Sequence, residues 1–357
     1  MKNESHEKER NLLSSLMGVA ETARKVVYDK AADFAADPAI GNMVSEFSAL
    51  SFVAVPPPSA TYTANGLVYE RRGDTFALIG AQGDITSANL PAELFGFPVT
   101  RIEEAALAGC TALTSATIPS GVTSIGQGAF SGCRSLERIV LPFVGESGEG
   151  EANAHLGYIF GAGQPSENGA QVPASLKTVI ITGGKRIGDN AFHWCSSLIS
   201  VTLPDSIDSI GSYAFCECSA LRSLTIPRGV RRIGYCAFGR CTSLTSVTVP
   251  KGVAVIEDYT FERCTALMTA RLPQGVTAIG NGAFFGCRSL VELTIPESVT
   301  SIAARAFSCC AVLASVRFAA PSGWLYGDAP VRPGLLTDPQ TAAKWLAKHC
   351  DRAYLRV

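Results

Sequence analysis

The sequence predicts a repeat solenoid with a cap at each end, because one short pattern recurs along most of the chain. A cysteine returns every 23 residues, with a single longer interval of 62 residues. A phenylalanine or leucine stands three residues before each of these cysteines, and a leucine stands three residues after it. Units of this kind cannot bury their apolar faces alone, so neighbours stack and share one core. The recurring cysteines are Cys110, Cys133, Cys195, Cys218, Cys241, Cys264, Cys287 and Cys310.

Each unit is expected to contain a short β-strand, a second short strand that directs residues such as Val230 and Ile233 inward, and a short helical corner. In one unit, the alternation of side chains directs Leu224 and Ile226 inward and Thr225 outward. The pattern Gly-x-x-Ala-Phe-x-x-Cys then indicates a helical turn that buries Ala237 and Phe238. One leucine-rich strand per unit at this period predicts a leucine-rich-repeat solenoid of about nine units.

The long interval contains an irregular extra unit, the insert of residues 143–183. Residues 156–160 imitate the corner of a regular unit, and residues 176–181 imitate its strand. Two polar, glycine-rich loops, 145–151 and 161–169, lie around them. Loops inserted into a solenoid are common carriers of function. Long loops also cost little entropy to close, so these two could be surface loops without a function. The sequence leaves both interpretations open.

Residues 1–55 are predicted to form a helical extension. Within it, residues 9–37 carry apolar side chains at spacings of three and four, with charged residues between them. Pro38 ends this amphipathic helix. The helix could pack as a cap, pair with a second copy in a homo-oligomer, or lie on a membrane surface.

The remaining domains follow from the repeat boundaries. Residues 61–100 are predicted to form an N-terminal β-cap, which contains a hairpin between 67–70 and 76–79. The leucine-rich-repeat solenoid occupies residues 101–320. A C-terminal helical cap completes the chain over residues 321–357.

The C-terminal cap contains a second clear helix start. Asp338 is expected to be the N-cap residue, and Pro339 occupies the first helical position. Before it, the segment 321–326 is predicted to pack over the last repeat.

Composition narrows the class of protein. Of 357 residues, 47% are hydrophobic and 17% charged, which indicates a folded chain with a large core. A net charge of -1 argues against a nucleic-acid-binding protein. The chain has no apolar run long enough for a membrane span and no signal peptide at its start. As written, it predicts a cytoplasmic protein, or a cell-surface or secreted one if a signal has been removed.

The recurring cysteines are expected to be buried free thiols that bond weakly to the backbone. A disulfide between neighbouring repeats is the alternative, since stacked residues lie close enough for one. The four other cysteines are too scattered in the sequence to define a disulfide framework. They are Cys216, Cys236, Cys309 and Cys350.

Two groups of exposed residues are candidates for binding a partner. Basic residues at equivalent or neighbouring repeat positions are expected to gather into a basic patch, which is either a solvated face or a docking site for an acidic partner. Threonines repeat at the outward strand position, where a partner could also dock. The basic candidates are Lys185, Arg186, Arg228, Arg231, Arg232 and Lys251, and the threonines are Thr202, Thr225 and Thr248.

Sequence motifs of enzymes are not found in the chain. It has no Gly-x-Ser-x-Gly elbow, no phosphate-binding Gly-Lys-Ser/Thr loop and no His-Glu-x-x-His helix. The four histidines lack further ligands at metal-binding spacing. The prediction is a non-enzymatic protein without cofactor or metal.

The sequence pattern of the repeats and both caps resemble the BspA-type leucine-rich-repeat family over roughly residues 65–357. The unit 122–133, the insert from 157–161 through 175–179, and the tail 338–343 carry the resemblance. It implies a bacterial, or bacterial-like protist, protein that binds other proteins as an interaction platform, often as a surface adhesin. The alternative is a cytoplasmic scaffold that self-associates through its N-terminal helix.

Overall fold

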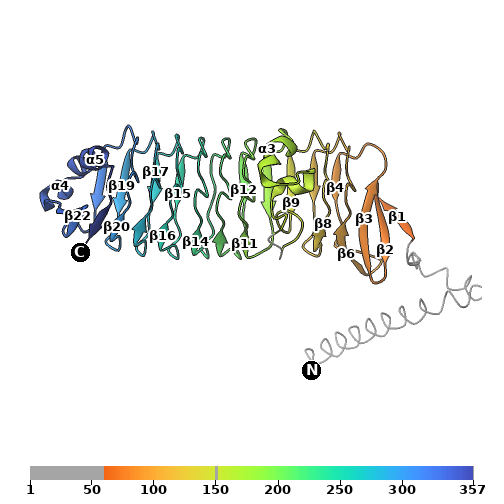
Figure 1. The fold of residues 1–357 in the computed structure, drawn as a ribbon. Helices are drawn as coiled ribbons and strands as arrows, with labels where there is room; N and C mark the ends of the chain where they lie inside the picture. Colours follow the sequence, from red (N-terminus) through yellow and green to blue (C-terminus); the bar gives the residue numbers. More distant parts are fainter. Residues whose placement is uncertain (1–59, 149–151, 357) are drawn as a thin grey trace, which may run out of the picture. The chain divides into compact units, whose positions relative to one another are not determined.

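The computed structural model describes residues 60–148 and 152–356, which belong to the second of two compact units, 1–55 and 56–357. The described residues form a solenoid of about ten stacked turns (Figure 1). The predicted helical extension, with its helix over residues 9–37, lies outside them.

The N-terminal cap begins with three antiparallel strands. The second and third, β2 and β3, form the hairpin predicted from the sequence. β3 then pairs in parallel with β6, which also pairs in parallel with the repeat strand β8 (Ser124–Ile125), so the cap covers the end of the stack. The cap strands are β1 (Thr61–Ala64), β2 (Leu67–Arg72), β3 (Thr75–Ala81), β5 (Glu93–Leu94) and β6 (Phe97–Ile102).

Two series of parallel strands run through the stack, and most units contribute one strand to each. Leu224 and Ile226 are buried and Thr225 is exposed, as predicted. A bridge between Ser200 and Ser223 continues the first series where no strand is formed. The first series is β4 (Ser87–Asn89), β7 (Ser115–Thr117), β9 (Arg138–Leu141), β10 (Thr178–Ile181), β12 (Ser200–Thr202), β15 (Ser246–Thr248), β17 (Thr269–Arg271), β19 (Glu292–Ile295) and β21 (Ser315–Phe318).

The second series consists of two-residue strands whose equivalent residues face one another in register, as Ser209 faces Arg232. It comprises β8 (Ser124–Ile125), β11 (Arg186–Ile187), β13 (Ser209–Ile210), β14 (Arg232–Ile233), β16 (Val255–Ile256), β18 (Ala278–Ile279) and β20 (Ser301–Ile302). Together the two series confirm the predicted repeat solenoid.

The corner of each regular unit is a run of turns, where the sequence predicted a short helical corner. The Ala237 N–H donates to the Gly234 carbonyl at 3.2 Å, and the Cys241 N–H donates to the Phe238 carbonyl at 3.2 Å. Helix cannot continue because Cys236 (φ 50) and Arg240 (φ 56) have left-handed backbone. The N–H groups of Cys236, Phe238 and Arg240 donate to carbonyls of the next unit.

A column of phenylalanine rings fills the core. From Phe192 to Phe307, neighbouring ring centroids lie 5.0 to 5.6 Å apart and the rings are within 20° of parallel. Six of the eight recurring cysteines bond to the unit before their own, as Cys241 Sγ does by donating to the Phe215 carbonyl at 3.1 Å. All recurring cysteines are free and all except Cys110 are buried, which confirms the predicted thiols.

The insert adds one irregular unit to the stack, as predicted. The Phe130 N–H donates to the Ile159 carbonyl at 2.8 Å, which joins the insert to the corner before it. β10 pairs in parallel with β9 on one side and β12 on the other. Its short helices are η1 (Leu156–Phe160), η2 (Pro165–Glu167) and α3 (Asn168–Gln171).

The C-terminal cap closes the other end of the stack. β24 pairs antiparallel with β20, and the ring of Trp324 packs against Phe318 with centroids 5.3 Å apart. Asp338 caps α5 as predicted, because its carboxylate accepts from the Thr341 N–H at 2.7 Å. The cap comprises β22 (Trp324–Tyr326), β23 (Ala329–Pro330), α4 (Pro333–Thr337), α5 (Pro339–Lys348) and β24 (Tyr354–Arg356).

A buried histidine lies inside the insert. His155 is 2% exposed, and its Nδ1 lies 2.7 Å from Oδ1 of Asn168. The same Oδ1 accepts from the Gly157 N–H at 3.0 Å, so His155 is the donor in this contact. Its Nε2 has no partner among the described residues. Burial lowers the pKa of His155 below its ordinary value, which keeps the ring neutral.

The ring column makes a stability prediction. The variant Phe238→Ala is expected to lower the free energy of unfolding by about 3–5 kcal/mol, because it opens a cavity between two stacked rings. Thr248→Ala, on an exposed strand position, is expected to change it by less than about 0.5 kcal/mol. Denaturant titration of both variants tests the assignment, and equal losses would contradict it.

His155 makes a prediction about pH. Unfolded chains protonate this histidine near its ordinary pKa of about 6.5, whereas the folded chain keeps it neutral to lower pH. The unfolded state therefore binds more protons, and the free energy of unfolding falls as the pH drops below about 6.5, by up to about 1.4 kcal/mol per pH unit. In denaturation measured across this range, His155→Gln should have a shallower slope. An unchanged slope would contradict the prediction.

Candidate functional site

The predicted binding residues lie at three separate places on the solenoid. Thr202, Thr225 and Thr248 occupy one exposed column on the first strand series. Arg186 and Arg232 belong to the second series, which forms different sheets. The structure therefore does not merge the threonines and the arginines into one sheet surface.

The basic residues are interrupted by acidic ones. Asp208 stands between Lys185 and Arg231, since its N–H donates to the Lys185 carbonyl and its carbonyl accepts from the Arg231 N–H. Arg228 and Lys251 are exposed at the same turn of two adjacent units. The predicted basic patch is thus a mixed-charge strip together with a separate pair at the turn.

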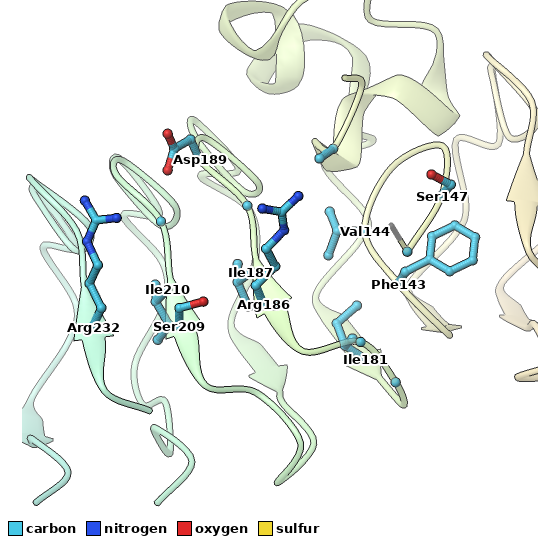
Figure 2. Close-up of a pocket in the computed structure, with 16 residues that line it drawn as sticks. Phe143, Val144, Ser147, Ile181, Arg186, Ile187, Asp189, Ser209, Ile210 and Arg232 are labelled. Atoms are coloured by element: carbon cyan, nitrogen blue, oxygen red, sulfur yellow. The ribbon is translucent and has the colours of Figure 1, made fainter. Parts of the chain in front are cut away.

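A cavity of about 400 Å³ opens where the insert meets the regular units (Figure 2). Arg186 and Arg232 line it from β11 and β14, and Phe143 and Val144 line it from the insert. Asp189 also borders the cavity, and its Oδ1 accepts from the Ser212 N–H at 2.7 Å. The cavity therefore carries both charge signs.

Aromatic side chains form a continuous row along the corners, a feature missed from the sequence. The Tyr213 and Tyr235 ring centroids lie 5.2 Å apart, and those of Tyr235 and Tyr259 lie 5.6 Å apart. His193 extends the row, because it contacts the rings of both Trp194 and Tyr213. Trp194 is 42% exposed and Tyr235 is 39% exposed, so this row is open to solvent.

Charged side chains continue the same corners. The Arg240 guanidinium lies 2.7 Å from the Glu217 carboxylate in the unit before it. A cavity of about 490 Å³ runs along this edge, lined by Arg240, Arg263, Arg288 and Phe285 among others. These aromatic and charged side chains along the corners together form the corner ridge: Trp194, Tyr213, Tyr235, Tyr259, Glu217, Arg240 and Arg263.

The backbone of the corner ridge is left-handed where glycine would be favoured. Two residues after the ring position, three other units carry glycine with positive φ, and the last regular unit carries Cys309 (φ 60): the glycines are Gly109, Gly132 and Gly286. Four consecutive units instead place long side chains there, with φ of 54° to 64°: Trp194, Glu217, Arg240 and Arg263. A non-glycine residue in this conformation costs about 1 kcal/mol or more, and such outliers cluster at functional sites. An alignment of the repeat columns would have shown this loss of glycine in the central units.

The family of the chain follows from its repeats. A family model described as a BspA type leucine rich repeat region matches six copies, over residues 83–147 and 185–317. These ranges cover more than half of the chain. The protein belongs to the BspA-type leucine-rich-repeat family.

Solved structures of bacterial proteins are similar to this BspA-type chain. A leucine-rich-repeat protein of T. pallidum is 29% identical, with 65% of this chain and 91% of that chain covered and a TM-score of 0.38. A leucine-rich cell surface protein from Faecalibacterium prausnitzii is 22% identical, with 74% and 96% covered and a TM-score of 0.35. The pneumococcal vaccine antigen PcpA is 13% identical, with 68% and 93% covered and a TM-score of 0.25. No curated protein matches the chain.

The described part of this BspA-type protein presents extended surfaces. Within residues 60–148 and 152–356, no cluster of three or more His, Cys, Asp or Glu side chains is arranged to hold a metal ion. The helices described there are all too short or too polar to cross a bilayer. A stacked-repeat scaffold of this family is a protein-interaction module, because its rigid, extended surface suits contact with another macromolecule.

The backbone of the ridge makes a prediction about glycine. At position 263, the variant Arg263→Gly is expected to be more stable than Arg263→Ala by about 1 kcal/mol, because φ is positive there. At position 288, which is not left-handed, the order should reverse, with Arg288→Ala the more stable. Thermal unfolding of the four variants measures both differences. If Arg263→Ala were as stable as Arg263→Gly or more stable, the backbone at position 263 would carry no strain and the prediction would be wrong.

Proposed function

We propose that the protein is a non-enzymatic interaction module that binds a protein partner through its corner ridge. The observation that carries this proposal is the set of long, exposed side chains held at left-handed positions, Trp194, Arg240 and Arg263, beside the row of tyrosines. Backbone stability alone favours glycine at these positions, which supports a role in binding for the side chains found there.

The chemistry of the corner ridge supports a protein partner. Tyrosine, tryptophan and arginine are the residues that contribute most to binding energy at protein interfaces. Ring contacts between Tyr213, Tyr235 and Tyr259 restrict their side chains before a partner arrives, which reduces the entropy lost on binding. Contact with a surface partner, as in an adhesin, is the finer form of the proposal, and family membership supports it.

Two alternatives stand beside the ridge. Binding could use the strand face with Thr202, Thr225 and Thr248, or the basic residues near Arg232. A cytoplasmic scaffold would instead assemble through residues 9–37, outside the described residues, and deletion of residues 1–55 would then abolish its oligomers.

A selection experiment separates the surfaces. Peptides are selected on the full chain from a phage-displayed random library, and their affinities are measured for surface variants. Tyr235→Ala and Arg240→Ala are expected to weaken binding at least about tenfold each, as hot-spot truncations do. Thr248→Lys and Arg232→Glu serve as matched controls on the other two surfaces, with no expected change. Peptides that lose affinity only for the control variants would overturn the ridge as the binding surface.

A further inference from the structure

Two cysteines outside the recurring series meet at the corner ridge. The Sγ atoms of Cys216 and Cys236 lie 3.7 Å apart, although the residues come from adjacent units. Both side chains are 6% exposed. The four extra cysteines were predicted only to be too scattered to define a disulfide framework, and the contact between these two was not predicted. The repeat period hides the pair, because their separation of 20 residues differs from the 23-residue step.

Corner hydrogen bonds bring the two segments together. The Phe215 N–H donates to the Ala237 carbonyl at 2.8 Å, and the Glu217 N–H donates to the Gly239 carbonyl at 2.9 Å. These bonds lie on both sides of Cys216 and hold it beside residues 236–239 of the next unit. The position of the pair therefore follows from the stacking of the backbone.

Gly239 provides the space for both sulfur atoms. A Cβ atom on this residue would lie 2.3 Å from Cys236 Sγ and 3.5 Å from Cys216 Sγ. The equivalent residue in the next units is Glu262 and then Phe285. Among the regular units, only the one that contains Cys236 has glycine at this place, so the sulfur atoms can approach each other.

The two thiols differ in acidity. The hydrogen bond from Cys216 lowers the pKa of Cys236, against the effect of burial, and the Arg240 charge acts in the same direction. The same hydrogen bond, together with burial, raises the pKa of Cys216. In the recurring series, burial raises the pKa of Cys241 and Cys264 well above the ordinary value. Cys236 is therefore the better nucleophile of the pair.

We propose that Cys216 and Cys236 are a redox-active dithiol that forms a disulfide between two adjacent units in the presence of a low-molecular-weight disulfide such as oxidised glutathione. The Cys236 thiolate attacks one sulfur of the reagent, and one glutathione thiolate leaves. Cys216 loses its proton and attacks Cys236 Sγ, and the second glutathione leaves. Two protein thiols are oxidised, and one glutathione disulfide is reduced to two thiols.

The geometry requires only a small movement for this reaction. The sulfur atoms must approach from 3.7 Å to a bond length of about 2.05 Å. Side-chain rotation supplies such a shift without separating the units. The cross-link would tie the corner that carries Tyr213 to the corner that carries Tyr235, independently of whether the ridge binds a partner.

Peptide mapping of the full chain tests the proposal. The folded protein is treated with oxidised glutathione, remaining thiols are alkylated, and disulfide-linked peptides are identified by mass spectrometry. A link between Cys216 and Cys236 is expected, while Cys218 and Cys241 are alkylated only after denaturation. Oxidation confined to other cysteines, or a 216–236 link only in denatured protein, would overturn the proposal.

Single variants assign the order of the steps. Cys216→Ser should accumulate a glutathione adduct on Cys236, because the resolving thiol is missing. Cys236→Ser should leave Cys216 largely unmodified, because that thiol is the weaker nucleophile. The reverse pattern would overturn the assigned roles. If either variant fails to fold, the wild-type map still decides whether the disulfide forms.

Discussion

Stacking of one phenylalanine ring on the ring of the next unit is the contact on which the solenoid depends. Each ring from Phe192 to Phe307 is buried and nearly parallel to its neighbours. From Cys218 to Cys310, the recurring thiol of each unit donates to the carbonyl of the ring residue one unit earlier, so the same few atoms fix the distance and the angle between units. A one-residue change of register would lose both contacts at once, which is why the 23-residue period is so strictly kept.

This register also determines what the surface can be. Once equivalent residues stack, every exposed position becomes a column, and a column can differ from unit to unit without disturbing the core. The left-handed corner position shows this freedom, since it holds glycine in some units and Trp194 or Arg263 in others. The buried phenylalanine ring stays the same from Phe192 to Phe307 and packs in the same way, while the ridge residue changes. The core contacts of a unit therefore do not depend on which residue occupies its left-handed corner position.

Sequence reasoning predicted the parts of the fold that depend on local pattern. Leu224, Phe238 and the cap at Asp338 were predicted correctly because periodicity and helix capping act within a few residues. The short helical turn predicted at the corner is instead a run of turns, because Cys236 and Arg240 have positive φ and their N–H groups bond to the next unit. The candidate arginines were identified as a patch, but the chain distributes them over strand and turn. The aromatic row and the Cys216–Cys236 pair were missed, because finding them requires knowing where each side chain points, and the repeat period alone does not give that.

The central units carry most of the unusual features, and their position in the stack gives a physical reason. A unit near an end packs against a cap, whose own contacts restrict its corner, as the Arg305 N–H is restricted by its bond to the Cys350 carbonyl. The units of Phe215, Phe238 and Phe261 have regular neighbours on both sides, so the ring column is complete there without the ridge. Left-handed backbone is not confined to these units, since Ala105, Arg305 and Cys309 nearer the ends also have positive φ. The central units differ in the long side chains two residues after the ring and in the close pair of thiols, so the ridge and the dithiol share one location.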